Sequence, residues 1–362
     1  MNKITLIAGA RPNFMKIAPI IHAIKKAQEN GYNIIYRLVH TGQHYDKKMS
    51  GNFFEQLDIP EPHVNLGAGG GSQAEQAGNI MVRFEQELLS HPTDLVLVVG
   101  DVTSTMACAI TAQKLHTKVA HVEGGIRSND WSMPEEINRL VTDAITNYFF
   151  TTSEIANTNL RNSGIREENI FYVGNTMIDT LLKQRPRFIK PPIWDTLNLE
   201  EKNFLVMTLH RPANVDQETQ LKALIDEIIV HTQDLPLIFP VHPRTAKVLE
   251  QLGIAHPRLH MIEPLGYLEF NYLVERAKVV LTDSGGITEE TTVMGVPCMT
   301  LRDNTERPET ITQGTNELIG TNPKAIAPAM EKLFSGKWKT GTIPHLWDGR
   351  TAERIVEYLL KL

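Results

Sequence analysis

Acidic residues follow two apolar runs at the point where each run ends. Residues 95–99 lead through Gly100 to Asp101, and residues 119–122 lead directly to Glu123. A carboxylate at the carboxyl end of a parallel strand points into the crevice where open α/β sheets bind their ligands. Glu135 comes shortly after, in a segment that begins with Pro134 and has a helical pattern. Acids that converge on one crevice form acid/base pairs, so the sequence indicates proton chemistry.

Each of these acids also has a structural interpretation. Asp101 is followed by Val-Thr-Ser-Thr and fits a helix N-cap. Glu135 and Glu136 fit the first turn of a helix, where the helix dipole favours negative charge. Glu123 is the hardest to explain in this way, because no helix follows it directly. The residues alone leave both interpretations open.

Two segments have the features of anion-binding turns. In residues 9–16, Gly-Ala-Arg-Pro-Asn-Phe-Met-Lys, a strand gives way to a helix near Pro12, so amide groups and Arg11 face the crevice. This segment is neither G-x-G-x-x-G nor a P-loop, which argues against a nicotinamide or ATP site. In residues 282–290, Thr-Asp-Ser-Gly-Gly-Ile-Thr-Glu-Glu, the glycines allow a close approach to a diphosphate. There Ser284 adds a hydroxyl donor and Glu290 can accept from ribose hydroxyls. An ordinary helix start is the alternative for both segments.

Three further groups of polar residues follow strand candidates in the second half of the chain. His210 and Arg211 could neutralise a phosphate leaving group, although a capping role is the simpler interpretation of an isolated histidine. The same holds for His242. Arg302 and Arg307 bracket a polar loop and form a candidate substrate clamp, with a solvated loop as the alternative.

Short apolar runs alternate with helical patterns along the chain. Strand candidates are residues 4–8, 34–39, 95–99, 119–122 and 148–150, with helical patterns such as 14–29, 74–89 and 134–146 between them. The pattern starts again with strand candidates at 204–208, 237–240, 259–262, 279–282 and 298–301. Near-continuous apolar strands joined by helices predict parallel sheets covered on both faces. We therefore predict an α/β fold of two doubly wound Rossmann-like domains, with the active site in a cleft between them.

A proline-rich segment, residues 185–193, suits a semi-rigid linker between these domains. The first domain is assigned residues 1–173 together with a C-terminal helix over 350–362, and it carries the carboxylates. The second is assigned residues 174–349 and carries the nucleotide site.

Composition excludes several classes of function. The chain has 362 residues, 41% hydrophobic residues and a net charge of −6, with no basic run that would mark a nucleic-acid or membrane surface. Cys108 and Cys298 stand in unrelated contexts, which argues against disulfides and zinc and favours the reducing cytoplasm. No signal peptide and no membrane-spanning segment are predicted.

Nine segments of the chain, taken in order, match one enzyme family. They are GARPNFMKIAP, HTGQHYD, GDVTST, HVEGGIRS, MPEEINR, TLHRPANVD, PVHPRT, TDSGGITEE and NTERPE. With these segments the chain resembles the non-hydrolysing UDP-N-acetylglucosamine 2-epimerases over nearly its whole length. That family has the two-domain fold of the GT-B type and interconverts UDP-GlcNAc and UDP-ManNAc.

The resemblance implies roles for individual positions. Asp101, Glu123 and Glu135 match the family's catalytic carboxylates, and His210 matches the histidine that assists departure of the phosphates. The positions that match substrate-binding residues are Arg11, Lys16, Phe270, Ser284, Gly285, Gly286, Glu290 and Arg307, with Phe270 at the uracil. No metal and no other cofactor is implied. The implied partners are the UDP-sugar and a second copy of the chain in a homodimer, and neither nucleic acid nor membrane.

The resemblance also implies a mechanism. The proton at C2 of the sugar is not acidic, because no carbonyl adjoins it. The family therefore eliminates UDP first to give 2-acetamidoglucal, and adds UDP back after a proton has reached C2 from the other face. Such chemistry needs an anion site for UDP and acids and bases on both sides of the sugar. The sequence does not order the proton transfers among the three carboxylates.

Two features depart from the family's pattern. Gly124 stands where an alanine is common, which is a small change. Asp46 stands where many bacterial members have a glutamine for a second, activating UDP-GlcNAc, and residues 67–71 offer no counterpart of their arginine. The resemblance therefore does not extend to that activation.

Four alternative functions are weighed against the GlcNAc epimerase. The UDP-2,3-diacetamido-glucuronate 2-epimerases share GARP and MPEEINR, but Arg307-Pro308 fits the GlcNAc type better. GARPNFMK argues against the hydrolysing epimerases. A GT-B glycosyltransferase would need an acceptor pocket and less clustering of acids, and a non-catalytic nucleotide-sugar sensor would not need the three carboxylates together.

Overall fold

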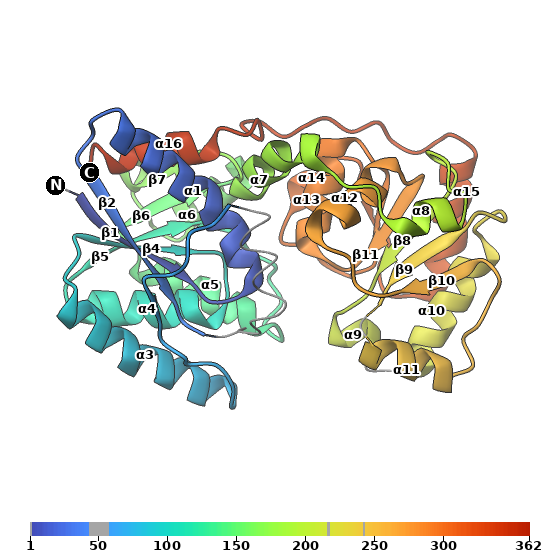
Figure 1. Ribbon diagram of the computed structural model, residues 1–362, viewed down its shortest axis with the longest axis horizontal. Helices are drawn as coiled ribbons and strands as arrows, with labels where there is room; N and C mark the ends of the chain where they lie inside the picture. The colour runs from blue at the N-terminus through green and yellow to red at the C-terminus, as the bar shows by residue number, and fades with distance from the viewer. Residues whose placement is uncertain (1, 43–57, 216–217, 242) are drawn as a thin grey trace. The chain divides into compact units, whose positions relative to one another are not determined.

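The chain forms two compact units (Figure 1). The computed structural model describes residues 2–42, 58–215, 218–241 and 243–362. The first unit comprises Met1–Lys183 and His345–Leu362, and the second comprises Gln184–Pro344.

A parallel sheet of seven strands forms the centre of the first unit. Its order is β3-β2-β1-β4-β5-β6-β7, so the direction of winding reverses between β1 and β4. The strands are β1 (Asn2–Ala8), β2 (Ile34–His40), β3 (Val64–Asn65), β4 (Leu95–Val99), β5 (Lys118–Val122), β6 (Tyr148–Thr151) and β7 (Ile170–Tyr172). All five residues of β4 are buried, because helices cover both faces of the sheet and leave no solvent side for polar residues.

The helices of the first unit pack as neighbours on this sheet. Helix α1 (Arg11–Glu29) packs against α16 (Thr351–Leu359), and α4 (Thr103–Lys114) packs against both α3 (Gln73–Ser90) and α5 (Pro134–Ile145) (Figure 1). The remaining α-helices described here are α6 (Glu154–Asn162) and α7 (Thr176–Gln184).

The second unit repeats this plan with six parallel strands in the order β10-β9-β8-β11-β12-β13. They are β8 (Leu205–Thr208), β9 (Leu237–Pro240), β10 (Leu259–Ile262), β11 (Val279–Thr282), β12 (Cys298–Thr300) and β13 (Asn316–Leu318). The helices are α8 (Pro192–Thr196), α9 (Pro212–Val215), α10 (Glu218–Val230), α11 (Pro243–Gln251), α12 (Tyr267–Arg276), α13 (Gly285–Met294), α14 (Pro308–Thr312) and α15 (Ile326–Phe334). Two parallel sheets flanked by helices confirm the predicted α/β fold of two doubly wound domains.

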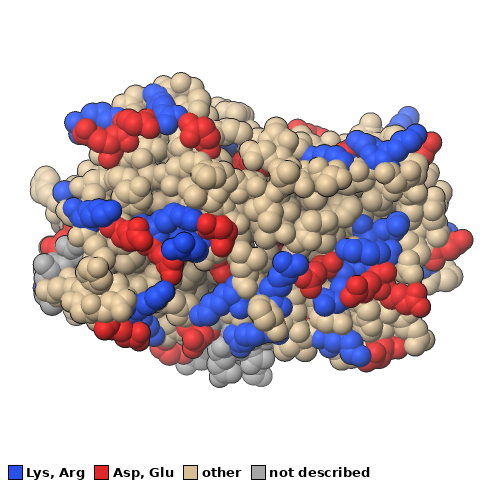
Figure 2. Space-filling model, turned by 90° about the horizontal axis from the view of Figure 1, so that it is seen from above, with Lys and Arg blue, Asp and Glu red and all other residues tan. Residues whose placement is uncertain are grey.

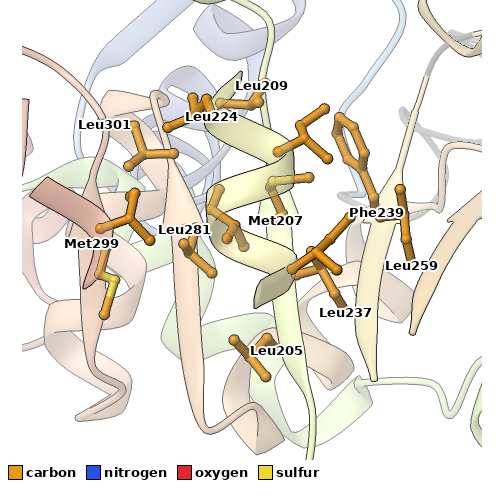
Figure 3. Packing of buried hydrophobic residues seen from close by; sticks show 14 of the residues in the cluster. Leu205, Met207, Leu209, Leu224, Leu237, Phe239, Leu259, Leu281, Met299 and Leu301 are labelled. Carbon is orange, nitrogen blue, oxygen red and sulfur yellow. The ribbon is translucent and has the colours of Figure 1, made fainter. Parts of the chain in front are cut away.

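Alternate residues of the second sheet belong to two separate cores. Leu205, Met207 and Leu281 point to one face and pack with α10 (Figure 3), whereas Val206 and Val280 belong to the core on the other face. Side chains of a strand alternate between faces, so burial of both sets requires an apolar residue at nearly every position. This explains why the sequence shows continuous apolar runs there.

The boundaries between the two units lie at 183/184 and 344/345 and differ from the predicted 173/174 and 349/350. The reason is that most of α7 and residues 345–349 belong to the first unit. In α7, Asp179 accepts hydrogen bonds from the amides of Thr351 and Ala352 at the start of α16, and Thr180 donates to the Met15 carbonyl at 2.6 Å. The Trp347 indole donates to the Thr152 carbonyl at 3.0 Å.

The segment predicted as a linker is structured. Residues 185–187 form a 3₁₀ turn, α8 begins at Pro192, and the Ile189 amide donates to the Leu268 carbonyl at 3.3 Å. The segment is therefore part of the second unit and is not a free spacer.

Charged side chains of both signs are interspersed on the face seen in Figure 2, as expected for a chain of small net charge. No helix among the described residues is both long and apolar enough to span a membrane.

Candidate active site

Several of the predicted site residues lie at, or one strand away from, the topological switch point of each sheet. In the first unit, the loops after β1, β4 and β5 carry residues 9–11, Gly100-Asp101 and Glu123. In the second unit, the loops after β8 and β11 carry His210 and Asp283-Ser284. Ligands of open α/β sheets bind outside the carboxyl ends of strands at such a point. Each unit therefore carries a group of candidate site residues at the carboxyl ends of its strands.

Glu123 is paired with a cation from α1. Lys16 Nζ donates to Glu123 Oε2 at 2.8 Å, and both side chains are largely buried. Gly100 lies beside this pair, because a Cβ there would come within 3.1 Å of Lys16 Nζ. The structure thus brings a predicted acid and a predicted cation together, although the two residues are 107 positions apart.

The backbone of Glu123 has the left-handed conformation, with φ of 73°. A residue with a Cβ adopts this conformation at a cost of about 1–2 kcal/mol. The Glu123 amide still donates to the Phe150 carbonyl at 2.9 Å, so the neighbouring strand end holds the chain in this turn. Strain of this kind clusters at functional sites, which supports a functional role for Glu123 over a capping role.

Asp101 is held by a buried arginine. Arg139 Nη1 donates to Asp101 Oδ2 at 2.6 Å, while the Asp101 side chain remains 28% exposed. The same guanidinium donates to Glu136 Oε2 and to Ser128 Oγ. Asp101 is therefore fixed at one oxygen and keeps access to solvent or a ligand.

Glu136 has a structural role. Burial alone would raise its pKa, but hydrogen bonds from the Ser128 and Asn129 amides and from the Ser128 hydroxyl, together with the positive charge of Arg139, lower it. Its carboxylate anchors the loop before α5 and accepts a hydrogen bond from Arg139, the residue that also donates to Asp101.

Glu135 differs from its neighbour. It lies in the first turn of α5 and is half-buried, and within the described part of the chain it makes no hydrogen bond or ion pair. Its carboxylate is therefore available to a ligand, as the predicted catalytic role requires.

The turn after β1 is held by Asn13. Asn13 Oδ1 accepts from the amides of Gly9 and Ala10, and its Nδ2 donates to the Val99 carbonyl at 3.0 Å. This residue ties the end of β1 to the end of β4. Arg11 is the first residue of α1, and its side chain lies outside the described residues, as do Asp46 and His242.

Gly124, which replaces the common alanine, is tightly enclosed. A Cβ at this position would come within 2.9 Å of Cδ1 of the buried Phe149 ring. An alanine would therefore require Phe149 to shift, whereas glycine fits the space beside this ring.

Asp283 organises the group of candidate site residues in the second unit. Its buried carboxylate accepts from the amides of His210 and Arg211 and from Asn214 Nδ2, and its Oδ1 lies 2.7 Å from His210 Nδ1. Burial would raise the Asp283 pKa, but the hydrogen bond and positive charge of His210 and the other donors lower it. The carboxylate therefore orients the His210 ring, which is 62% exposed, toward solvent or a ligand.

Ser284, Gly285 and Gly286, the predicted phosphate-binding turn, lie at the start of α13. Ser284 is the N-cap, and its hydroxyl makes no cap hydrogen bond to the helix. A Cβ on Gly285 would meet Glu306 Oε1 at 2.9 Å, so a larger residue there would displace the Glu306 carboxylate of the loop after β12. Helix amides and a hydroxyl are therefore available to an anion.

Glu290 lies in α13, buried beside Tyr267. The Tyr267 hydroxyl donates to Glu290 Oε1 at 2.7 Å. Burial raises the Glu290 pKa to about 7, and this effect outweighs the hydrogen bond from Tyr267. Phe270, in the same helix as Tyr267, is half-buried and packs against the core of the second unit.

The two arginines of the predicted clamp are buried and paired with acids. Arg302 Nη1 lies 2.7 Å from Glu306 Oε2, and Arg307 Nε donates to Glu289. Burial and the nearby Arg211 lower the pKa of Arg302, although Glu306 opposes the shift.

Sequence reasoning missed several supporting residues, notably Asn13, Arg139, Asp283 and Tyr267. Asp283 carried a usable signal, because it is an acid directly after a buried strand, like Glu123. Asn13 lies within the predicted helix start and bonds the nearby amides of Gly9 and Ala10. The contacts of Arg139 with Asp101 and of Tyr267 with Glu290, in contrast, are remote in sequence and leave no local signal. Within the described ranges, no group of three or more His, Cys, Asp or Glu residues is placed to hold a metal ion.

A family model described as UDP-N-acetylglucosamine 2-epimerase matches residues 25–360. The chain belongs to the UDP-N-acetylglucosamine 2-epimerase family. The UDP-N-acetylglucosamine 2-epimerase of Methanocaldococcus jannaschii is 41% identical over 370 residues, covering 99% of this chain and 98% of that protein. A crystal structure of that enzyme with UDP-GlcNAc and UDP is similar with a TM-score of 0.88, covering 99% of this chain and all of the other.

The chain is also similar to an epimerase that is named for a different nucleotide sugar. The UDP-2,3-diacetamido-2,3-dideoxy-D-glucuronate 2-epimerase of Pseudomonas aeruginosa is 38% identical over 364 residues, covering 99% of this chain and 100% of that protein. The comparisons confirm the predicted family and the predicted class of enzyme. They do not test the roles of single residues.

Proposed function

We propose that this chain reversibly converts UDP-GlcNAc to UDP-ManNAc by inverting C2 of the sugar. One observation carries the proposal. In this member of the epimerase family, Asp101 and Glu123 lie at the ends of two adjacent strands, β4 and β5. Lys16 forms an ion pair with Glu123. The second unit supplies a turn, residues 284–286, and a histidine, His210, suited to a diphosphate.

The proposed reaction has two stages. A carboxylate removes the C2 proton while the C1–O bond breaks, and the electron pair of that bond leaves on the β-phosphate of UDP. The product is 2-acetamidoglucal, with a double bond between C1 and C2. A second carboxyl group, in its protonated form, then delivers its proton to the other face of C2, and the UDP oxygen adds back to C1.

The residues of this chain fit separate tasks in these stages. Asp101, Glu123 and Glu135 are the proton donors and acceptors, and His210, held by Asp283, stabilises the departing phosphate. Ser284, Gly285 and Gly286 bind the diphosphate, Glu290 the ribose and Phe270 the uracil. Arg11, Lys16 and Arg307 supply positive charge for the substrate.

Solvent exchange tests the proposal. The protein is incubated with UDP-GlcNAc in D₂O and the sugar is followed by NMR. Deuterium at C2 and the appearance of UDP-ManNAc are expected. Free ManNAc would indicate a hydrolysing enzyme, and absence of exchange despite tight UDP binding would refute the epimerase proposal.

Asp101→Asn tests the assignment of the carboxylates. The variant should lower the rate of C2 exchange by about 10²- to 10⁴-fold, the usual contribution of a general acid or base. UDP binding should stay nearly unchanged, because the proposed UDP site lies in the second unit. Asp226→Asn, which removes an exposed charge paired with Lys222, is the control and should exchange like the wild type. Exchange at the wild-type rate in Asp101→Asn would show that Asp101 has no part in proton transfer.

A second candidate substrate is UDP-2,3-diacetamido-glucuronate, because the Pseudomonas aeruginosa enzyme named for it is nearly as similar as the archaeal GlcNAc enzyme. Parallel measurement of kcat/KM for the two nucleotide sugars separates the candidates. A higher value for the diacetamido sugar would replace UDP-GlcNAc as the substrate and leave the chemistry at C2 unchanged.

We further propose that the chain acts as a homodimer in the cytoplasm, as the family resemblance implies. Analytical ultracentrifugation should give a mass near twice the 40.7 kDa of the chain. A single species at the monomer mass with full activity would contradict the dimer.

A further inference from the structure

A buried histidine lies between the two strand ends that carry the proposed proton-transfer acids. His121 belongs to β5, two residues before Glu123, and has no exposed surface. Its Nε2 lies 2.8 Å from the carbonyl oxygen of Gly100, the residue before Asp101. Its Nδ1 lies 2.8 Å from Oδ1 of Asp143, which is in α5.

The hydrogen-bond partners of both ring nitrogens of His121 favour donation by the ring. A carbonyl oxygen can only accept, so Nε2 carries a proton. The partner of Nδ1 is a carboxylate that already accepts twice at its other oxygen, from the Gly125 amide at 3.0 Å and from Arg127 Nη1 at 2.6 Å. An ionised carboxylate likewise only accepts, so Nδ1 carries a proton too.

Asp143 is ionised despite its burial. Burial alone would raise its pKa, but the hydrogen bond and charge of His121 and the charge of Arg127 outweigh this effect and lower it. His121 and Arg127 together bring two positive charges to one carboxylate. One net positive charge is therefore left within this buried group, next to the turn that leads to Asp101.

The contacts of this group fix two turns at once. The His121 ring holds the carbonyl of Gly100, and Asp143 holds the amide of Gly125, two residues after Glu123. Gly100 has little room to move, because a Cβ there would lie 3.1 Å from Lys16 Nζ and 3.9 Å from Glu123 Oε2. A displacement of Gly100 would therefore change the positions of Asp101, Lys16 and Glu123 relative to one another.

We propose that His121 and Asp143 form a buried imidazolium–carboxylate pair that positions Asp101 and Glu123 for proton transfer at C2. The proposal rests on the proposed epimerase function. Neither residue is proposed to touch the substrate, so both are positioning residues. The pair adds its contacts at Gly100 and Gly125 to those that Asn13 makes with Val99 and that Glu123 makes with Phe150. A displacement of about 1 Å can slow a reaction by about 10²-fold.

The protonation of His121 can be measured without any assay of activity. In protein labelled with ¹⁵N-histidine, two-bond ¹H–¹⁵N correlation spectra at the assay pH should show both His121 nitrogens protonated, with exchange-protected Hδ1 and Hε2. The signal is assigned by its loss in His121→Asn. A neutral tautomer with one bare nitrogen would overturn the ion pair.

Kinetics of three variants test the positioning role. His121→Asn and Asp143→Asn should each lower kcat about 10- to 100-fold, with KM and the Kd for UDP within about twofold of the wild type. The double variant should lose no more than the worse single variant, because either substitution already breaks the pair. Losses that multiply in the double variant would contradict a shared role.

Asp179→Asn is the matched control. Asp179 is also a buried acid of the first unit that accepts from backbone amides, but its partners lie at the start of α16. It should change thermal stability without lowering kcat. An equal loss of kcat in Asp179→Asn would mean that destabilisation of the first unit alone explains the effect, and would overturn the positioning role.

The outcomes separate this inference from the proposed function. If the wild-type chain does not act on UDP-GlcNAc or its diacetamido analogue, the proposed function fails and the positioning role fails with it, while the NMR result still decides the ion pair. If the wild type is active and the variants keep its kcat, the positioning role alone is wrong.

Discussion

At the scale of single residues, Glu290 has the most unusual environment of the proposed ligand contacts. Its carboxyl group is buried, and a tyrosine hydroxyl is its hydrogen-bond donor. A neutral donor stabilises a carboxylate less than a cation does, so burial dominates and the pKa rises to about 7. The folded second unit therefore keeps a proton on Glu290 at a pH where the unfolded chain releases it.

This raised pKa predicts a pH-dependent stability. Between pH 4.5 and 7 the folded chain binds the Glu290 proton and the unfolded chain does not. The contribution of Glu290 to the stability of the fold therefore falls as pH rises through this window, and it is constant above pH 7. Glu290→Gln removes the effect and can still accept from Tyr267. The stability of the variant relative to the wild type should be roughly 2.5 kcal/mol greater at pH 8 than at pH 5. Chemical denaturation of the second unit at both pH values measures this.

The control for this prediction is Glu250→Gln, because Glu250 is exposed on α11. It should give the same difference from the wild type at both pH values. A pH-independent effect of Glu290→Gln would mean that Glu290 is ionised in the fold throughout the range.

At the scale of elements, the turn after β5 determines where the acids lie. Glu123 and Gly125 both have positive φ, of 73° and 81°, so the chain reverses sharply between β5 and the loop that leads to α5. A Cβ on Gly125 would lie 2.4 Å from the Ala156 carbonyl oxygen in α6. Only glycine allows this approach, so the turn packs directly against α6.

Alanine at position 125 should consequently destabilise the first unit by several kcal/mol, through a backbone clash added to the unfavourable φ. Gly164→Ala is a matched control, because Gly164 has nearly the same φ, 83°, with no atom within 4 Å of the added Cβ. That change should cost only about 1 kcal/mol. Urea unfolding of both variants gives the comparison, and equal losses would mean that the clash with Ala156 is relieved by a movement of α6.

At the scale of the whole molecule, the chain divides the proposed chemistry between two units. The proton-transfer acids all belong to the first unit, and the proposed diphosphate, ribose and uracil contacts with Phe270, Ser284 and Glu290 belong to the second. The prediction of a shared cleft stays a prediction, and it has a measurable consequence.

Hydrogen exchange detected by mass spectrometry should follow this division. UDP alone should protect amides of the second unit, chiefly in residues 209–211 and 284–288, because it lacks the sugar. UDP-GlcNAc should protect these and, in addition, residues 100–102 and 123–136 of the first unit. Protection of the first unit by UDP alone would show that the nucleotide, and not only the sugar, contacts the acids.

The sequence by itself determined the class of fold and where the site residues stand along the chain. Strand ends follow from local apolar runs, and acids placed directly after such runs can be recognised without knowledge of the rest of the fold. Asp101 and Glu123 were identified in this way, and Asp283 follows the same rule. Local order also predicted a helix from residue 287, directly after the glycine turn, and α13 begins two residues earlier, at Gly285.

Only the tertiary structure decided what each site residue contacts. Lys16 meets Glu123 across 107 positions of sequence, and Arg139 meets Asp101 across 38. Such pairs leave no local pattern, because they form only when a helix and a strand end that are remote in sequence meet at one edge of a sheet. The boundary between the units is of the same kind, since α7 and α16 are joined through Asp179 by contacts between segments remote in sequence. Local periodicity therefore places residues on elements, and long-range packing alone selects their partners.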